Sequence, residues 1–163
     1  MTYLLDANTY IQAKSLHYRM HIVPGFWDWL DQQFGVGQVG SIRSVYDELS
    51  AGGDELSEWV KLRRHQFLAV DEEVTQAVFT DIADHVVTHS SYQEPHVSSF
   101  LAGADPWLVA KAKVIGDQVV TNEARVGLGS KKVKVPNICD QFQVTRLDTY
   151  DLLDTLRARF VLD

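Results

Sequence analysis

Four acidic residues lie after predicted strands or in the helices beside them, where functional groups are common in parallel α/β sheets. Asp6 follows the apolar run "YLL", and Glu123 follows "VVTN". Glu48 lies on the flank of a predicted helix in "SIRSVYDELS", and Asp105 directly precedes Pro106 at the start of another. In such sheets, functional groups gather beyond the carboxyl ends of the strands. We therefore expect these four carboxylates, which come from four separate segments, to lie near one another.

A cluster of four carboxylates would be costly without a cation. Two carboxylates about 5 Å apart repel by roughly 3 kcal/mol at an effective dielectric constant near 20. Ligation by oxygen alone suits Mg²⁺ or Mn²⁺, which position phosphoryl oxygens and lower the pKa of an attacking water. Each acid also has a structural interpretation: Asp6 and Asp105 as helix N-caps, Glu48 as a solvated helix residue and Glu123 as part of a polar turn. If the four acids converge, the sequence predicts a divalent metal site.

Alternating strands and helices must position these acids. Short apolar runs predict strands at residues 2–5, 38–41, 67–70, 118–121 and 144–147. Apolar residues at helical spacing predict helices at residues 9–14, 24–34, 42–50, 54–64, 72–87, 106–115 and 149–160. Residues 89–105 are predicted to form a long loop near the site. The alternation indicates an α/β fold with a mostly parallel sheet of about five strands, covered on both faces, in one domain spanning residues 1–163.

Composition and charge limit the classes of function. The net charge of −7 and the pI near 5.3 argue against nucleic-acid binding through bulk charge alone. The single cysteine, Cys139, excludes an internal disulfide and a cysteine-based zinc site. The sequence contains no run of about eighteen apolar residues, which a membrane span would need. Its amino terminus lacks the basic residues with which a signal peptide begins. We therefore expect a soluble protein of the cytoplasm.

The stretch Gly35 to Gly40, "GVGQVG", matches the spacing of a dinucleotide-binding loop. That loop must leave a strand and open a helix, because the helix N-terminus holds the pyrophosphate. Here a predicted helix precedes the glycines and a predicted strand follows them. We interpret Gly35 and Gly37 as a helix stop and a turn.

The order and spacing of four motifs resemble those of the PIN-domain ribonucleases, many of which are toxins of toxin–antitoxin pairs. The motifs are "YLLDAN", "VGSIRSVYDEL", "GADPWLVAKA" and "VVTNE", and the tail "KVPNICDQFQVTRLDTYDLL" is similar to that of a small unassigned PIN subfamily. The resemblance implies an acidic catalytic and metal-binding site at Asp6, Glu48, Asp105 and Glu123. It implies supporting polar roles for Asn8, Ser41, Thr121 and Asn122.

The resemblance also implies a three-layer α/β/α sandwich, Mg²⁺ or Mn²⁺ in the acidic pocket, and hydrolysis of single-stranded RNA to a 5′-phosphate and a 3′-hydroxyl. The partners it implies are a cognate antitoxin and a second copy of the chain. Asp6 and Asp105 would bind the principal metal, with Glu48 and Glu123 completing the pocket. Glu123 departs from the aspartate usual in the family, so water could lie between it and the metal. The basic residues after the fourth strand, which could hold RNA phosphates or form an ordinary lysine-rich turn, are Arg125, Lys131, Lys132 and Lys134.

Three other interpretations stay open at this point. "LLDANT" approaches the D-x-D-x-T pattern of haloacid-dehalogenase phosphatases, in which the first aspartate is the nucleophile, although no later Asp-Asp pair follows a strand. His85 and His89, spaced i, i+4 near Asp81 and Asp84, could ligate zinc, but no third ligand is identifiable. A non-catalytic PIN-like interaction module would instead use an exposed tryptophan as a partner anchor.

Overall fold

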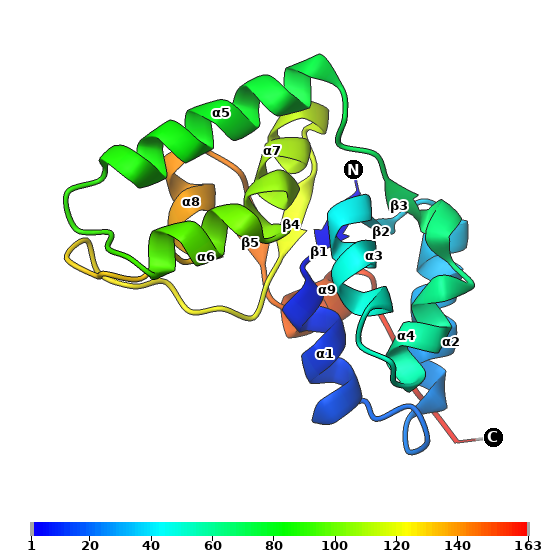
Figure 1. The fold of residues 1–163 in the computed structure, drawn as a ribbon. Coiled ribbons are helices and arrows are strands. Elements are labelled where there is room, and N and C mark those ends of the chain that lie inside the picture. Colours follow the sequence, from blue (N-terminus) through cyan, green and yellow to red (C-terminus); the bar gives the residue numbers. More distant parts are fainter. Residues whose placement is uncertain (1, 163) are drawn as a thin grey trace.

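The computed structural model describes residues 2–162, which include a five-stranded sheet in the order β3-β2-β1-β4-β5 (Figure 1). All neighbouring strands are parallel. Leu4, at the centre of the sheet, aligns with Gly40 of β2 on one side and Val119 of β4 on the other. The strands are β1 (Tyr3–Leu5), β2 (Val39–Ile42), β3 (Phe67–Leu68), β4 (Gln118–Val120) and β5 (Arg146–Leu147).

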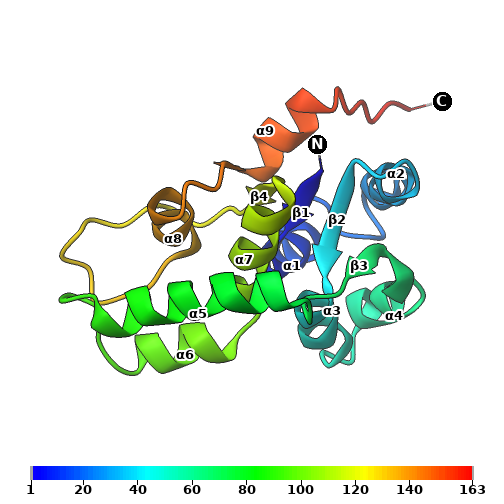
Figure 2. The ribbon, with the colours of Figure 1, turned by 90° about the horizontal axis from the view of Figure 1, so that it is seen from above.

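Helices cover the sheet on both sides, so the fold is the predicted three-layer α/β/α sandwich. Figures 1 and 2 show α5, α6, α7 and α8 gathered on one side of β1 and β2, with α2 and α4 on the other side. The helices are α1 (Ala7–Ser15), α2 (Pro24–Gly35), α3 (Arg43–Ser50), α4 (Glu55–Lys61), α5 (Glu73–Thr88), α6 (His96–Ala102), α7 (Asp105–Ile115), α8 (Val135–Gln141) and α9 (Thr149–Thr155), with a 3₁₀ turn, η1, at Arg64–Gln66. None of the helices in residues 2–162 is long and apolar enough to cross a membrane.

The winding of the sheet changes direction between β1 and β4. The chain runs outward from β1 to β2 and β3, then returns to β4 on the other side of β1. Ligands of parallel α/β sheets bind beyond the carboxyl ends of the strands at such a change of direction. The segments that leave β1 and β4 begin at Asp6 and Thr121, so both residues lie at this switch point.

Much of the core lies between the central strands and α7, and the rest includes buried residues of α1, α2 and α4. Leu4, Val119 and Val120 are fully buried, as are Leu108 and Val109 of α7. A parallel strand that is covered on both faces is apolar along its whole length rather than at every second residue. This explains why the strand signals in the sequence are short continuous apolar runs.

Two helices were not predicted. The predicted loop at residues 89–105 contains α6, in which Val97 and Phe100 are buried among exposed serines that obscure the helical spacing. The segment before β5 contains α8, whose Val135, Ile138 and Cys139 are buried at i, i+3, i+4 spacing. Proline at the first turn is common in helices, so Pro136 was a usable start signal for α8.

Other predicted elements are longer than the observed ones. The helix predicted at residues 149–160 ends at Thr155, because Arg157 adopts a left-handed conformation (φ 53°) and Ala158 donates to the Leu153 carbonyl at 2.9 Å. The helix predicted at residues 54–64 ends at Lys61 and is followed by η1. The strands at residues 67–70 and 144–147 are two residues long, at Phe67–Leu68 and Arg146–Leu147.

The glycine-rich stretch is a helix end and a turn, as predicted. Helix α2 ends at Gly35, and Gly37 has a left-handed φ of 72° before β2 begins at Val39. Gly37 N–H donates to the Phe34 carbonyl at 3.1 Å, which closes the last turn of α2. No helix opens after these glycines until α3, so the geometry of a dinucleotide-binding loop is not formed here.

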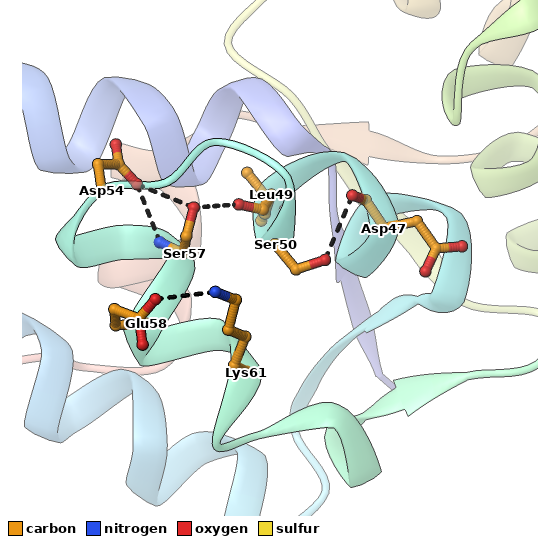
Figure 3. A network of polar contacts seen from close by, with 7 residues as sticks. All are labelled: Asp47, Leu49, Ser50, Asp54, Ser57, Glu58 and Lys61. Atoms are coloured by element: carbon orange, nitrogen blue, oxygen red, sulfur yellow. Dashed lines mark hydrogen bonds and ion pairs between the residues drawn. The ribbon is translucent and has the colours of Figure 1, made fainter.

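The end of α3, the helix that carries Glu48, is fixed by α4. Asp54 caps α4 by accepting the Ser57 N–H at 2.9 Å, and the Ser57 hydroxyl donates to the Leu49 carbonyl at 2.7 Å (Figure 3). Ser57 is fully buried, so water does not compete for this bond. On the exposed side, the Ser50 hydroxyl donates to the Asp47 carbonyl at 3.3 Å. The buried bond therefore joins the last turn of α3 to the first turn of α4.

Candidate active site

Asp6 lies at the switch point between β1 and α1 and is 1% exposed. It caps α1, because its Oδ1 accepts the Thr9 N–H at 2.7 Å and the Thr9 hydroxyl at 2.8 Å. The Thr121 side chain also hydrogen-bonds to Asp6. Burial raises the pKa of Asp6 despite these hydrogen bonds, which act in the opposite direction, and the Glu123 charge adds to the increase. Asp6 therefore has a structural role as the cap of α1 and is also a buried acid with a raised pKa.

Asp105 is the first residue of α7, and its carboxyl group is largely buried close to the other three acids. Its pKa is raised to about 7, first by burial and then by the charges of Asp6, Glu123 and Glu48, while Lys134 lowers it. The cap of α7 is Ala104 rather than Asp105, so the N-cap interpretation of Asp105 is wrong. The charges of the other three acids thus act on Asp105.

Glu48 reaches from α3 to the start of α7. Its Oε1 accepts the backbone N–H of Ala104, the N-cap of α7, at 2.8 Å. A carboxylate is favourable at a helix N-terminus because it satisfies an unpaired N–H and opposes the positive end of the helix dipole. Glu48 therefore holds α7, and with it Asp105, in a fixed position relative to α3.

Glu123 has the same kind of role toward α8. Its Oε2 accepts the backbone N–H of Val135, the first residue of α8, at 2.9 Å. Its Oε1 lies 3.5 Å from Nζ of Lys134, and its own N–H donates to the Thr121 hydroxyl at 3.2 Å. The longer glutamate side chain, compared with aspartate, allows this contact across the loop that ends at α8.

Three of the supporting polar residues connect the segments around the acids. The Ser41 hydroxyl of β2 donates to the Leu5 carbonyl of β1 at 2.6 Å. Asn122 accepts the Thr149 N–H at 3.0 Å and donates to Gln12 Oε1 at 3.0 Å, which ties α9 and α1 to the end of β4. Thr121 contacts both Asp6 and Glu123, as described above. The fourth, Asn8, is exposed on the first turn of α1.

The four predicted basic residues do not form one patch. Arg125 pairs with Asp140, with Nε 3.0 Å from a carboxylate oxygen. Lys134 pairs with Glu123, and together with Lys132 it lines a pocket of about 350 Å³ that also contains Asp105. Lys131 is exposed outside that pocket. Lys132 and Lys134 are therefore the basic residues nearest to the acids.

The donor set of the site fits a hard divalent cation, although the side chains are not arranged as a complete ligand shell. Among residues 2–162, no three acidic, histidine or cysteine side chains lie close enough together to hold a metal ion. One oxygen each of Glu48 and Glu123 accepts a backbone N–H, whereas Asp6 and Asp105 are buried acids whose charges repel. A cation would relieve this repulsion, and carboxylate oxygens are ligands for Mg²⁺ and Mn²⁺. Metal ligation by all four acids stays a prediction.

Sequence reasoning missed two features that shape the site. Thr9, whose N–H and hydroxyl both bond to Asp6, stands three residues after it, which is the spacing of a helix cap. The start of α8, which receives Glu123, was missed because α8 itself was missed. The Thr9 contact could have been found from its spacing to Asp6. The start of α8 could have been found only by recognising the helix from Pro136 and the apolar residues at helical spacing around it.

The structure also bears on the three alternative interpretations. Asp6 is almost fully buried and its Oδ1 is hydrogen-bonded, which does not favour direct attack on phosphorus as in a phosphatase. His85 packs edge-on against His89, with ring centroids 5.5 Å apart, and burial lowers its pKa. The tryptophans are buried or partly buried, so none presents an exposed anchor; they are Trp27, Trp29, Trp59 and Trp107.

Comparison with known proteins agrees with this fold. A family model described as "Domain of unknown function (DUF4411)" matches residues 3–160. No curated protein matches the chain. VapBC2 from Rickettsia felis, solved bound to a DNA fragment from its promoter, has a TM-score of 0.54 at 10% identity, covering 91% of this chain and 98% of that one. FitAcB from Neisseria gonorrhoeae has a TM-score of 0.51 at 18% identity, covering 91% and 99%. At these identities the likeness shows the fold, which is PIN-like.

Proposed function

The chain belongs to the family described as a domain of unknown function (DUF4411), and from its site we propose that it is a metal-dependent ribonuclease that hydrolyses single-stranded RNA. The observation that carries the proposal is the environment of Asp105. Burial and three further carboxylates raise its pKa to about 7 at the switch point of a parallel sheet. Strongly perturbed acids at such a position are typical of functional sites.

Asp6 and Asp105 would hold the metal, because both are buried acids with raised pKa values. A divalent ion bound there would supply a water of lowered pKa and stabilise the charge that develops on phosphoryl oxygens. Thr9 and Thr121 orient Asp6 by hydrogen bonds. Glu48 holds the start of α7 on which Asp105 stands, and Glu123 holds the start of α8. Lys132 and Lys134, in the pocket that contains Asp105, would bind a phosphate of the RNA.

The proposed biological setting is that of a toxin in a toxin–antitoxin pair. VapBC2 and FitAcB, the two structures compared above, are toxin–antitoxin complexes with PIN-domain toxins, which supports a cognate antitoxin as the partner of this chain. A second copy of the chain is a further proposed partner. We place this activity in the cytoplasm, where the RNA would be found and where the single cysteine would stay reduced.

The test is cleavage of an end-labelled single-stranded RNA by purified protein with Mn²⁺ or Mg²⁺. Chelator-treated protein and the double variant Asp6→Asn, Asp105→Asn should not cut, because neither can form the metal site. Asp81→Asn is the matched control, since it removes one exposed carboxylate on α5 and should cut at the wild-type rate. The products are expected to carry a 5′-phosphate and a 3′-hydroxyl.

Two results would contradict the proposal. Equal cutting by wild type and the double variant would assign the activity to a contaminant. No cutting of any RNA by a protein that still binds Mn²⁺ would favour the interaction module. Release of phosphate from 4-nitrophenyl phosphate, lost on Asp6→Asn, would instead support the phosphatase alternative.

A further inference from the structure

A pocket lies beside the candidate active site, between the carboxyl-terminal half of α1 and the start of α9. Its volume is about 240 Å³, and its lining includes Gln12, His17, Tyr18, Asn122 and Tyr150. Pockets for drug-sized ligands range from about 300 to 1,000 Å³. The pocket is therefore of a size for a single heterocycle rather than for a larger ligand.

Three aromatic rings surround this pocket. The His17 ring lies 6.3 Å from the Tyr150 ring and 6.5 Å from the Tyr18 ring, measured between centroids. Tyr18 is held in place because it stacks on Phe26 at 4.3 Å, whereas Tyr150 is 54% exposed and has ring surface free. Burial, and to a smaller extent Tyr150, raises the pKa of the Tyr18 phenol. Proteins that bind single-stranded RNA stack unpaired bases on aromatic rings of this kind.

Three consecutive residues connect the pocket to the acids and to the lysines. Thr121 hydrogen-bonds to Asp6, Asn122 lines the aromatic pocket, and Glu123 pairs with Lys134. An extended chain advances by at most about 3.6 Å per residue. The aromatic pocket, the acids and the basic pocket that contains Asp105 therefore all lie within the reach of a few nucleotides.

The charge of the aromatic pocket favours a base over a phosphate. Its lining contains no lysine or arginine, and it includes Asp148. One oxygen of Asp148 caps α9 by accepting the Asp151 N–H at 2.8 Å. A carboxylate repels phosphate but accepts hydrogen bonds from amino and imino groups of a base.

We propose that the pocket formed by His17, Tyr18 and Tyr150 is a subsite for one nucleobase of single-stranded RNA, next to the phosphodiester at the acidic site. The proposal rests on the proposed function, because it takes RNA as the ligand. The base stacks on Tyr150 and His17, while the flanking phosphates pass over the acids toward Lys132 and Lys134. The pocket would hold the substrate in register.

The test measures binding without cleavage. A fluorescent hexauridylate and a hexameric ribose-phosphate chain without bases are titrated by fluorescence anisotropy, in chelator, against wild type, Tyr150→Ala, Tyr150→Phe and His17→Ala. Stacking of one base on an aromatic ring is worth about tenfold or more in affinity. We expect Tyr150→Ala to weaken hexauridylate binding about tenfold and Tyr150→Phe to change it less than twofold. The chain without bases should bind wild type and Tyr150→Ala equally.

Equal affinity of wild type, Tyr150→Ala and His17→Ala for hexauridylate would overturn the proposal. So would a result in which Tyr150→Ala weakens binding of the chain without bases as much as it weakens binding of hexauridylate. The second result would show that the substitution acts on the backbone path or on folding. Absence of RNA binding by wild type would also overturn it and would leave a protein partner as the occupant. Binding is measured without metal, so a protein that shows the expected pattern but never cuts RNA would contradict only the proposed function.

Discussion

At the level of single residues, Asp105 carries an electrostatic cost that depends on pH. Its pKa of about 7, compared with an ordinary 3.8, means that the folded protein binds this proton more tightly than the unfolded chain does. The stability that results is fully present below about pH 4 and is lost as the pH rises toward 7. Above pH 7, the ionised carboxyl stays buried among like charges, and a bound cation would offset this cost.

We predict that Asp105→Asn stabilises the protein in the presence of chelator, although it should abolish the proposed RNA cleavage. The amide of the variant does not ionise. The variant should therefore lack the loss of stability that ionisation of Asp105 causes in wild type between pH 5 and pH 7.5. At pH 7.5 we expect a gain of about 1–2 kcal/mol, which corresponds to roughly 3–8 °C in Tm for a chain of this length.

The measurement is thermal unfolding of both proteins in chelator across that pH range. The difference in Tm between the variant and wild type should grow with pH and level off above pH 7. The same changes in Tm for Asp81→Asn would contradict this prediction. So would an Asp105→Asn variant that is less stable than wild type at every pH, because ionisation of Asp105 would then not destabilise the fold.

The positions of the acids at strand ends and helix starts could be predicted from the sequence, but their contacts could not. Asp6 and Asp105 could be found because strand ends and helix starts have local signals. The Glu48 contact with Ala104 spans 56 residues, and that of Glu123 with Val135 spans 12. Contacts over such separations depend on how helices pack, which spacing along the chain does not specify.

At the level of helices and strands, glutamate side chains accept backbone N–H groups at the starts of α7 and α8. Glu123→Ala and Glu123→Gln both remove the charge, but only alanine also removes the acceptor for the Val135 N–H. We predict that the alanine variant is less stable than the glutamine variant by about 1 kcal/mol, the usual cost of a lost helix cap. Urea unfolding of the two variants measures this difference directly.

The activity of these two variants separates capping from metal ligation. If Glu123 mainly holds α8, Glu123→Gln should retain much more RNA cleavage than Asp6→Asn does. A loss as complete as that of Asp6→Asn, with equal stability of the two Glu123 variants, would make Glu123 a metal ligand instead.

The junction of α3 and α4 gives a second test at this scale. Ser57→Ala removes a buried hydrogen bond and leaves the Leu49 carbonyl without it, so we expect a loss of about 1–2 kcal/mol in the free energy of unfolding. Ser50→Ala removes an exposed hydrogen bond to the Asp47 carbonyl and should cost less than about 0.5 kcal/mol. Equal losses in urea unfolding would show that the buried bond does not hold the junction.

The sequence predicted the type and order of most elements. All five strands and seven of the helices were placed, because buried parallel strands and amphipathic helices have distinct spacing. Helix α6 was missed since its apolar face has only Val97 and Phe100 among polar residues. The early end of α9 depends on the left-handed conformation of Arg157. Arginine rarely adopts this conformation, so its presence in the sequence does not predict a helix end.

At the level of the whole molecule, the proposed ribonuclease has a net charge of −7 and would have to bind RNA at an acidic edge. Lys132 lines the pocket that contains Asp105, so it would neutralise about one phosphate. We predict that Lys132→Ala weakens RNA binding in chelator and reduces the slope of log affinity against log salt by about one.

The matched control for this change is Lys61→Ala, which removes the same charge from the end of α4, where Lys61 pairs with Glu58 at 2.8 Å. It should leave the salt slope unchanged. Equal slopes for wild type and Lys132→Ala would remove Lys132 from the path of the RNA.

The proposed function requires that the acids at the switch point form a divalent metal site. Titration of Mn²⁺ into the protein, with free Mn²⁺ followed by electron paramagnetic resonance, tests it without any assumption about RNA. Wild type and Asp81→Asn should bind Mn²⁺ equally, and Asp105→Asn should bind it at least tenfold more weakly. Equal binding by all three proteins, or no binding by wild type, would contradict the claim.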